Sequence, residues 1–204
     1  MKLIYAAASP YARMVLVTAH EVGLAKQVEI VQSGPLPPTG VNEAVTKVNP
    51  LGKVPCLVTD HGHSLYDSRV ICEYLCHHAG DKRLLPDEPV KRFRLLTLQA
   101  LGQGMCDTAL GIRYEVTARP EPMRWAEWLE RNRLRLVSAL DEIERSWTGE
   151  LAEMNAGSIA AACALGYLDL RFGDMNWRGG RPKTAAAFEK LASLPSMQAT
   201  VPTG

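Results

Sequence analysis

The spacing of apolar residues changes several times within the first 79 residues of the chain. Short stretches rich in β-branched residues alternate there with stretches of helical spacing, which predicts strands alternating with helices. The expected strands cover residues 2–6, 28–32, 56–59 and 64–66, and the expected helices cover residues 10–23, 42–48 and 68–79. A strand–helix–strand unit favours a parallel first pair, whereas the short connection between the last two strands favours an antiparallel hairpin.

Beyond residue 90 the pattern is helical throughout. Helices are expected over residues 90–119, 123–147, 158–172 and 182–193, separated by segments that contain proline or glycine. An alternating α/β half followed by a run of helices is typical of two domains. The sequence therefore predicts a thioredoxin-like α/β domain over residues 1–79, a linker over 80–89 and an all-helical domain over 90–204. Residues 34–40, with three prolines, are expected to form a loop.

Composition and charge restrict the classes of function. Hydrophobic residues make up 47% of the chain and charged residues 22%, as in an ordinary globular protein. Because the formal net charge is only +1, we expect no nucleic-acid partner. No apolar run approaches the roughly 20 residues that span a bilayer, and no secretory leader is visible, so we expect no membrane association. Five scattered cysteines, an odd number, favour reduced thiols in the cytoplasm.

A metal site is not expected. Cys72 and Cys76 lie four residues apart, beside His77 and His78, a spacing at which two thiols can share a metal. The same spacing places both thiols on one helix face with apolar neighbours, which indicates core packing. No second pair of ligands with suitable spacing accompanies them.

Ser9 stands at the turn between the first expected strand and the first expected helix. Pro10 suits the first position of a helix, which makes Ser9 the N-cap, beside free backbone N–H groups and the positive end of the helix dipole. Ser9 either caps the helix only or also donates a hydrogen bond to the sulfur of a bound thiol. One such bond to a charged group stabilises it by roughly 1.5–3 kcal/mol, or about one to two units of thiol pKa.

Two further segments are candidates for binding. Residues 49–57 place two prolines around a glycine directly before a strand. If the bond between Val54 and Pro55 is cis, the Val54 backbone can pair with an extended peptide; a trans turn is the alternative. Asp67 and Ser68 start the third helix, where they either cap it or hold the amino and carboxyl groups of a ligand. A thiol, a peptide backbone and an amino-acid end group are all present in glutathione.

With these segments the chain resembles the bacterial glutathione S-transferases. The strongest likeness is Asn-Pro-Leu-Gly-Lys-Val-Pro-Cys-Leu at residues 49–57, followed about ten residues later by Asp-Ser-Arg at 67–69. Residues 164–172 resemble the core helix of the family's helical domain, and residues 194–200 resemble the family's C-terminal end. The likeness therefore extends over the whole chain.

The resemblance implies roles for particular residues. Ser9 would stabilise the glutathione thiolate and Val54, before a cis Pro55, would pair with the cysteinyl backbone. Asp67 and Ser68 would hold the γ-glutamyl end, and Lys53 is a weaker candidate for the glycine carboxylate. The electrophile would bind along residues 94–114, where the candidate lining residues are Met105, Ile112 and Tyr114. Homodimers are common in the family and are implied here too.

The chain departs from its relatives at two positions. Serine stands where glutaredoxins and some transferase classes have a cysteine, so mixed-disulfide chemistry on a protein sulfur is not expected at Ser9. The helix expected to start at Ser158 has Ala161 where the family usually has an acidic residue that closes a capping box. Either lower stability, by about 0.5–2 kcal/mol, or a cap made differently is expected.

The leading hypothesis is a detoxifying glutathione transferase that directs the thiolate at a small electrophile. Peroxide reduction and dehalogenation use the same thiolate and stay open. The alternative from another class is a non-catalytic adaptor, for which a thiol site would have no purpose. A glutathione-dependent isomerase would need more basic residues near the first helix than Arg13.

Overall fold

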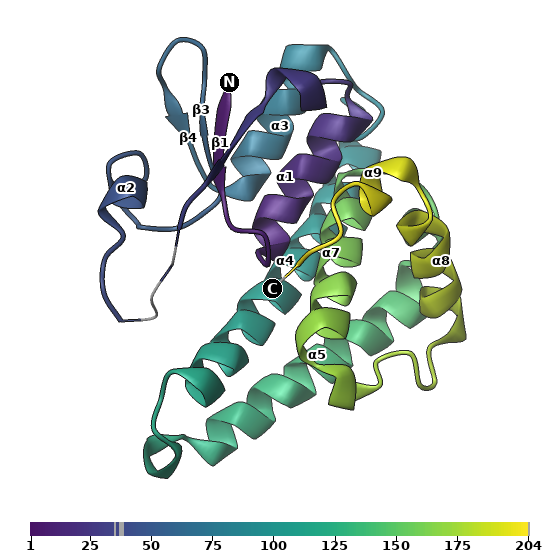
Figure 1. The fold of residues 1–204 in the computed structure, drawn as a ribbon. Coiled ribbons are helices and arrows are strands. Elements are labelled where there is room, and N and C mark those ends of the chain that lie inside the picture. The colour runs from purple at the N-terminus through teal and green to yellow at the C-terminus, as the bar shows by residue number, and fades with distance from the viewer. Residues whose placement is uncertain (35, 37–38, 204) are drawn as a thin grey trace. The chain divides into compact units, whose positions relative to one another are not determined.

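A computed structural model describes residues 1–34, 36 and 39–203, so the three prolines of the expected loop lie outside the described residues. The chain forms two compact units, one from Met1 to Arg92 with the segment from Pro195 onward, the other from Phe93 to Leu194. The expected fold class, an α/β first part followed by helices, is confirmed (Figure 1). The boundary between the two units therefore lies after Arg92, within the helix Pro89–Thr117, and the C-terminal segment belongs to the first unit.

The first unit contains a four-stranded sheet in the order β2-β1-β3-β4. The strands are β1 (Lys2–Tyr5), β2 (Glu29–Gln32), β3 (Cys56–Val58) and β4 (Ser64–Leu65). β1 pairs with β2 in parallel and with β3 antiparallel, and β3 pairs antiparallel with β4. Both the parallel pair and the hairpin were predicted from the connection lengths.

Three α-helices complete this α/β arrangement: α1 (Pro10–Glu21), α2 (Glu43–Thr46) and α3 (Ser68–Ala79), with a 3-10 turn at Ala25–Gln27. α1 and α3 pack against each other, and α2 lies apart from them (Figure 1). α3 begins at the N-cap Asp67 and ends at Gly80, whose φ of 68° is the left-handed geometry that glycine adopts at little cost. The bounds of α3 agree with the sequence prediction.

The second unit is helical. It consists of α4 (Pro89–Thr117, from Phe93 onward), α5 (Ala126–Ser146), α6 (Thr148–Leu151), α7 (Ala156–Arg171) and α8 (Pro182–Ala192), with 3-10 turns at Glu121–Met123 and Gly173–Met175. α7 is buried from Ala156 to Leu168. Its backbone lies so close to α4 that a Cβ added at Gly102 would be 2.6 Å from the carbonyl carbon of Ala160. Glycine is therefore required at this helix contact.

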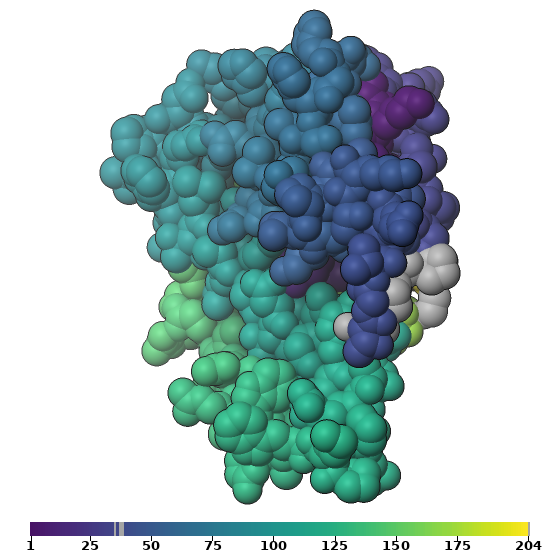
Figure 2. Space-filling model, turned by 90° about the vertical axis from the view of Figure 1, so that its left-hand side faces the viewer, coloured from purple at the N-terminus to yellow at the C-terminus, as the bar shows by residue number. Residues whose placement is uncertain are grey.

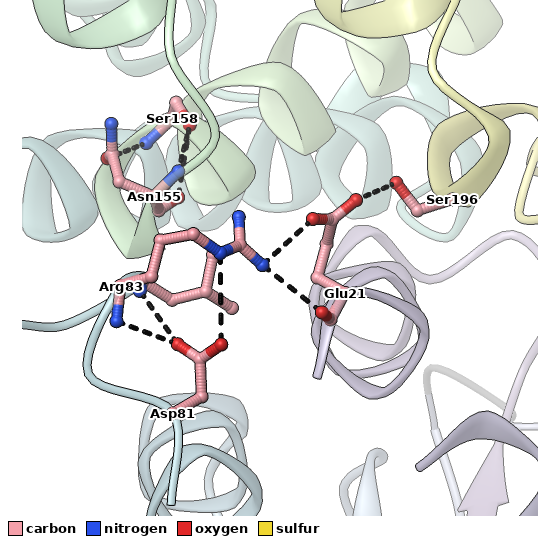
Figure 3. A network of polar contacts seen from close by, with 7 residues as sticks. Glu21, Asp81, Arg83, Asn155, Ser158 and Ser196 are labelled. Carbon is pink, nitrogen blue, oxygen red and sulfur yellow. Dashed lines mark hydrogen bonds and ion pairs between the residues drawn. The ribbon is translucent and has the colours of Figure 1, made fainter. Parts of the chain in front are cut away.

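The C-terminal segment, with α9 (Pro195–Gln198), packs with α1 in the first unit. The Ser196 hydroxyl donates to Glu21 Oε1 at 2.6 Å, and the Arg83 guanidinium lies between Glu21 and Asp81 (Figure 3). Arg83 Nη2 also donates to the Glu21 carbonyl at 3.1 Å. This network links three parts of the first unit: the end of α1, the segment that follows α3, and helix α9. The sequence pattern did not indicate this attachment.

The N-terminus of α7 shows how this helix is capped although Ala161 replaces the acidic residue that is usual in the family. Asn155 is the N-cap, and its Oδ1 accepts from the Ser158 N–H at 2.8 Å. In return the Ser158 hydroxyl accepts from the Asn155 N–H at 2.9 Å (Figure 3). The capping box is therefore complete three residues earlier than the sequence suggested, and Ala161 lies fully buried inside the helix. The cap is made differently, as one of the two expectations allowed.

This cap can be tested by Ser158→Ala. The hydroxyl is buried, so its loss leaves the Asn155 N–H without an acceptor, and the free energy of unfolding should fall by about 1–3 kcal/mol. The change is measured as a lower urea midpoint at constant m-value. Ser193→Ala, which removes an exposed hydroxyl bonded to the Lys190 carbonyl, is the matched control and should stay within about 0.5 kcal/mol. Equal midpoints for the two variants would contradict the cap.

Candidate functional site

Three turns lie at the same end of the sheet: the turn after β1, the turn before β3 and the turn after β4. Ile4 in β1 pairs with Cys56 in β3, and Leu57 in β3 pairs with Leu65 in β4. Because both pairings are antiparallel, the end of β1, the start of β3 and the end of β4 lie at the same end of the sheet. The turns that follow β1, precede β3 and follow β4 carry the predicted thiol, backbone and end-group sites.

Ser9, in the turn after β1, is the N-cap of α1. Its backbone is extended (φ −78°, ψ 118°), and its Oγ accepts from the Ala12 N–H at 3.2 Å. Among the described residues the hydroxyl hydrogen has no acceptor, and the side chain is partly exposed. Pro10 occupies the first helical position. The capping role is therefore present, and the hydroxyl keeps a proton to donate to a ligand.

Arg13 follows Ser9 by one helical turn, and it is a buried cation with an exposed fraction of 6%. Its Nη2 donates to the Met197 carbonyl of α9 at 3.1 Å, and its Nε is buried without a partner in the described chain. No carboxylate of the described residues pairs with it. Because Arg13 lies four residues after Ser9, the two residues are on the same face of α1.

Residues 49–55 form the turn before β3. The Asn49 Nδ2 donates to the Lys53 carbonyl at 2.8 Å, and the Leu51 N–H donates to Asn49 Oδ1 at 3.0 Å. The bond between Val54 and Pro55 is cis, as the family resemblance implied, and the trans turn left open by the residues alone is not formed. Within the described part of the chain, the Val54 N–H and C=O make no backbone hydrogen bond.

This turn lies at the surface of the first unit, where Pro50 and Leu51 are exposed. The segment through α2 and the β3–β4 hairpin, drawn in blue, lies at the surface of the first unit in Figure 2. Lys53 is exposed, and its ammonium group has no hydrogen bond or ion pair with the described residues. Val54 is partly exposed, so its unpaired backbone groups are within reach of a ligand.

The turn after β4 contains Asp67 and Ser68. A cis bond joins Tyr66 to Asp67, whose Oδ1 accepts from the Arg69 N–H at 3.0 Å as the N-cap of α3. Asp67 Oδ2 also forms an ion pair with the Arg69 guanidinium at 3.1 Å. The Asp67 carboxylate is about half exposed, whereas Ser68 is buried. Of the two, Asp67 presents its side chain to a ligand in this structure.

The three positions expected to line an electrophile cleft differ in exposure. Tyr114 is 41% exposed, but Met105 and Ile112 are only 2% and 1% exposed. Met105 and Ile112 lie seven residues apart on α4, on the face that also buries Ala109, and this face belongs to the core. A lining role is thus compatible with the structure only for Tyr114.

None of the five cysteines is a candidate nucleophile. All five are buried and free. Burial raises the pKa of Cys76 to about 11, assisted by the charges of Asp81 and Glu73, and burial likewise raises the pKa of Cys56 and Cys106. A thiol with a raised pKa carries little of the reactive thiolate at neutral pH. A sulfur nucleophile would therefore have to come from a ligand.

Among the residues that the structure describes, no group of three or more His, Cys, Asp or Glu side chains is arranged to hold a metal ion. None of the helices in the same residues combines the length and the apolar character that a bilayer crossing requires.

Family models and relatives match the chain in both units. Residues 8–78 match the model of the glutathione S-transferase N-terminal domain, and residues 126–190 match that of the C-terminal domain. The uncharacterized GST-like protein YibF of Escherichia coli K12 is 32% identical over 99% of this chain and 98% of its own length.

Solved structures extend the comparison. A glutathione transferase family member from Pseudomonas fluorescens Pf-5, with bound glutathione, has a TM-score of 0.96 and 40% identity, over 100% of this chain and 99% of that one. A second structure from the same organism holds S-(propanoic acid)-glutathione, with a TM-score of 0.91 and 40% identity over the full length of both chains. Matches in both units and along nearly the whole length show that this chain belongs to the glutathione S-transferase family.

Proposed function

We propose that this protein is a glutathione transferase in which the Ser9 hydroxyl stabilises the glutathione thiolate. The observation that carries the proposal is the position of this hydroxyl: it caps α1 and keeps its hydrogen free among the described residues. A sulfur anion there would gain a hydrogen bond, the positive end of the α1 dipole and the buried charge of Arg13. All three favour the thiolate over the thiol.

The rest of the tripeptide has matching partners on the same unit. The unpaired N–H and C=O of Val54 would bond the cysteinyl residue as an added strand does. Asp67 would accept from the γ-glutamyl ammonium group, and the N-terminus of α3 at Ser68 would receive its carboxylate. Lys53 would pair with the glycine carboxylate. The glutathione bound in the 40% identical relative supports this assignment of the ligand.

The reaction proposed is attack of the thiolate on a small electrophile. The ligand S-(propanoic acid)-glutathione in the second Pseudomonas fluorescens structure carries a substituent on sulfur, as the product of such a reaction would. Because all five cysteines of this chain are buried, the nucleophile is the ligand's own sulfur. Peroxide reduction would use the same thiolate, and a non-catalytic adaptor is the second candidate, which has no use for a free hydroxyl at Ser9.

Ser9→Ala tests the role of the hydroxyl. Turnover should fall about 10- to 100-fold, the kinetic equivalent of one lost hydrogen bond to an anion, while glutathione affinity changes by less than about threefold. Since the lost donor had favoured the thiolate, the pKa of the bound thiol should rise and the pH–rate profile should move to higher pH. Steady-state rates and thiolate absorbance across pH measure both effects.

Two control variants separate catalysis from helix capping. Ser9→Thr keeps both the cap and the hydroxyl and should keep most of the activity. Ser9→Asp keeps the cap but places a negative charge against the sulfur, so it should fold normally and lose turnover. Unchanged turnover in Ser9→Ala rejects the role of the hydroxyl, and no glutathione binding by the parent protein favours the adaptor.

The cysteines give an independent prediction. Ellman's reagent at pH 7.5 should react with fewer than one thiol per molecule of native protein in the time that it needs to react with all five thiols of the unfolded protein. The reason is that burial both blocks access and raises the pKa of Cys56, Cys76 and Cys106. A thiol that reacts within seconds, with loss of turnover, would reassign the nucleophile to the protein.

We also propose that the protein is a cytoplasmic homodimer with a detoxifying role. Exposed apolar side chains of the first unit, Leu51, Tyr66 and Val70, are the candidates for the contact between copies. Leu51→Asp should then shift the sedimentation-equilibrium mass from the dimer toward the monomer, whereas exposed Val41→Asp serves as the control. A monomeric parent protein would contradict the dimer.

A further inference from the structure

Helices α4 and α7 are in close contact in their N-terminal halves in the second unit. A Cβ at Gly157 of α7 would touch the Leu95 carbonyl of α4 at 2.8 Å, and one at Gly102 of α4 would touch the Ala160 backbone of α7 at 2.6 Å. Residue numbers therefore rise together along both helices. Beyond the contact of Gly102 with Ala160, Arg113 of α4 and Arg171 of α7 both lie near Tyr167 of α7, close enough for their charges to act on its hydroxyl.

Neither arginine is neutralised. Both side chains are half-buried, and in the described residues neither guanidinium has an ion pair or a hydrogen-bond acceptor. The Arg171 Nε is fully buried and without a partner. A buried guanidinium nitrogen that lacks an acceptor costs free energy, and a bound anion would supply that acceptor.

The neighbouring carboxylates are engaged elsewhere. Glu115 accepts from Arg119 and from the Trp125 N–H. Asp169 accepts from the Trp177 indole and from both terminal nitrogens of Arg178. Among the described residues, neither Glu115 nor Asp169 therefore acts as a counter-ion for Arg113 or Arg171.

Tyr167 adds a donor to this pair, since it precedes Arg171 by one turn of α7. The residue is only 3% exposed, and its hydroxyl has no hydrogen-bond partner in the described chain. Burial raises the pKa of Tyr167, although the nearby charges of Arg113 and Arg171 lower it in part, so the phenol stays protonated at neutral pH. The partly exposed Tyr114 follows Arg113 directly.

We propose that Arg113, Arg171 and Tyr167 bind the carboxylate of the second substrate, so that the preferred electrophiles are small organic acids. A carboxylate has two oxygens that accept from a guanidinium fork and from a phenol at once. It also offers an acceptor to the buried Arg171 Nε, which lacks one in the described chain. This inference rests on the proposed transferase function, of which it specifies the substrate class.

Two electrophiles of similar shape test the preference for an acid. In 4-chloro-3-nitrobenzoate and 4-chloro-3-nitrobenzamide, the glutathione thiolate attacks the carbon that bears chlorine, a C–S bond forms, and chloride leaves with the C–Cl electron pair. The parent protein should have a kcat/KM for the acid at least about tenfold above that for the amide, after correction for the uncatalysed rates. Turnover of the amide without this preference contradicts the anion site and leaves the transferase function intact.

Substitutions test which residues cause the preference for the acid over the amide. Arg171→Gln and Arg113→Gln should each lower the ratio of acid to amide kcat/KM about tenfold, Tyr167→Phe should lower it less, and Arg171→Lys should keep part of it. Arg131→Gln, which removes an exposed arginine of α5 that has no acidic partner in the described chain, is the matched control and should leave the ratio unchanged. An equal loss in Arg131→Gln would reduce the effect to net charge and overturn the proposal.

A binding measurement keeps the inference testable if neither compound is turned over. Calorimetry with the unreactive 4-methyl-3-nitrobenzoate and its amide, in the presence of glutathione, should show tighter binding of the acid to the parent protein and no such difference in Arg171→Gln. Tighter acid binding without turnover supports the anion site while it counts against the transferase. Equal binding of acid and amide overturns the anion site.

Discussion

The antiparallel pairing of β3 with β1 is the constraint on which the candidate site depends. It brings the start of β3 to the end of β1, and the β3–β4 hairpin adds the end of β4 at the same place. A shift of this register by one residue would move the fully buried Leu3 or Leu57 to the opposite face of the sheet. The side chains that stabilise the sheet therefore also fix the positions of the turns that carry Ser9, Val54 and Asp67.

Local chemistry explains why the sequence predicted some elements well. A capping aspartate and a left-handed glycine mark both ends of α3, and these signals are read within a few residues. In contrast, the face of α4 that enters the core depends on its partner α7. Apolar residues occur on several sides of α4, so Met105 and Ile112 looked as suitable for a cleft as Tyr114. Only the contact of two helices decides which of them remains exposed.

Hydrogen bonds between residues far apart in the sequence could not be predicted, for another reason. Arg13 and Met197 are joined by a hydrogen bond across 184 positions, and Glu21 and Ser196 across 175. No periodicity or motif encodes such pairs, because each residue has an ordinary local role. The predicted thiol, backbone and end-group positions were easier, since each lies at a turn with proline, glycine or a capping residue. Those signals indicate where backbone groups are unpaired, and unpaired groups are what a peptide ligand can bind.

The arginines of the helical unit differ in whether a carboxylate neutralises them, and the unpaired ones are informative. Most arginines of this unit have a carboxylate partner: Arg94 with Glu150, Arg119 with Glu115, Arg133 with Asp174, Arg145 with Glu142, Arg178 with Asp169 and Arg181 with Asp141. An exposed cation such as Arg131 is solvated by water and needs no partner. Arg113 and Arg171 are half-buried, both lie near the buried Tyr167, and both are unpaired in the described chain. Since desolvation makes such an arrangement unfavourable without an anion, the bound state is the one in which these charges are satisfied.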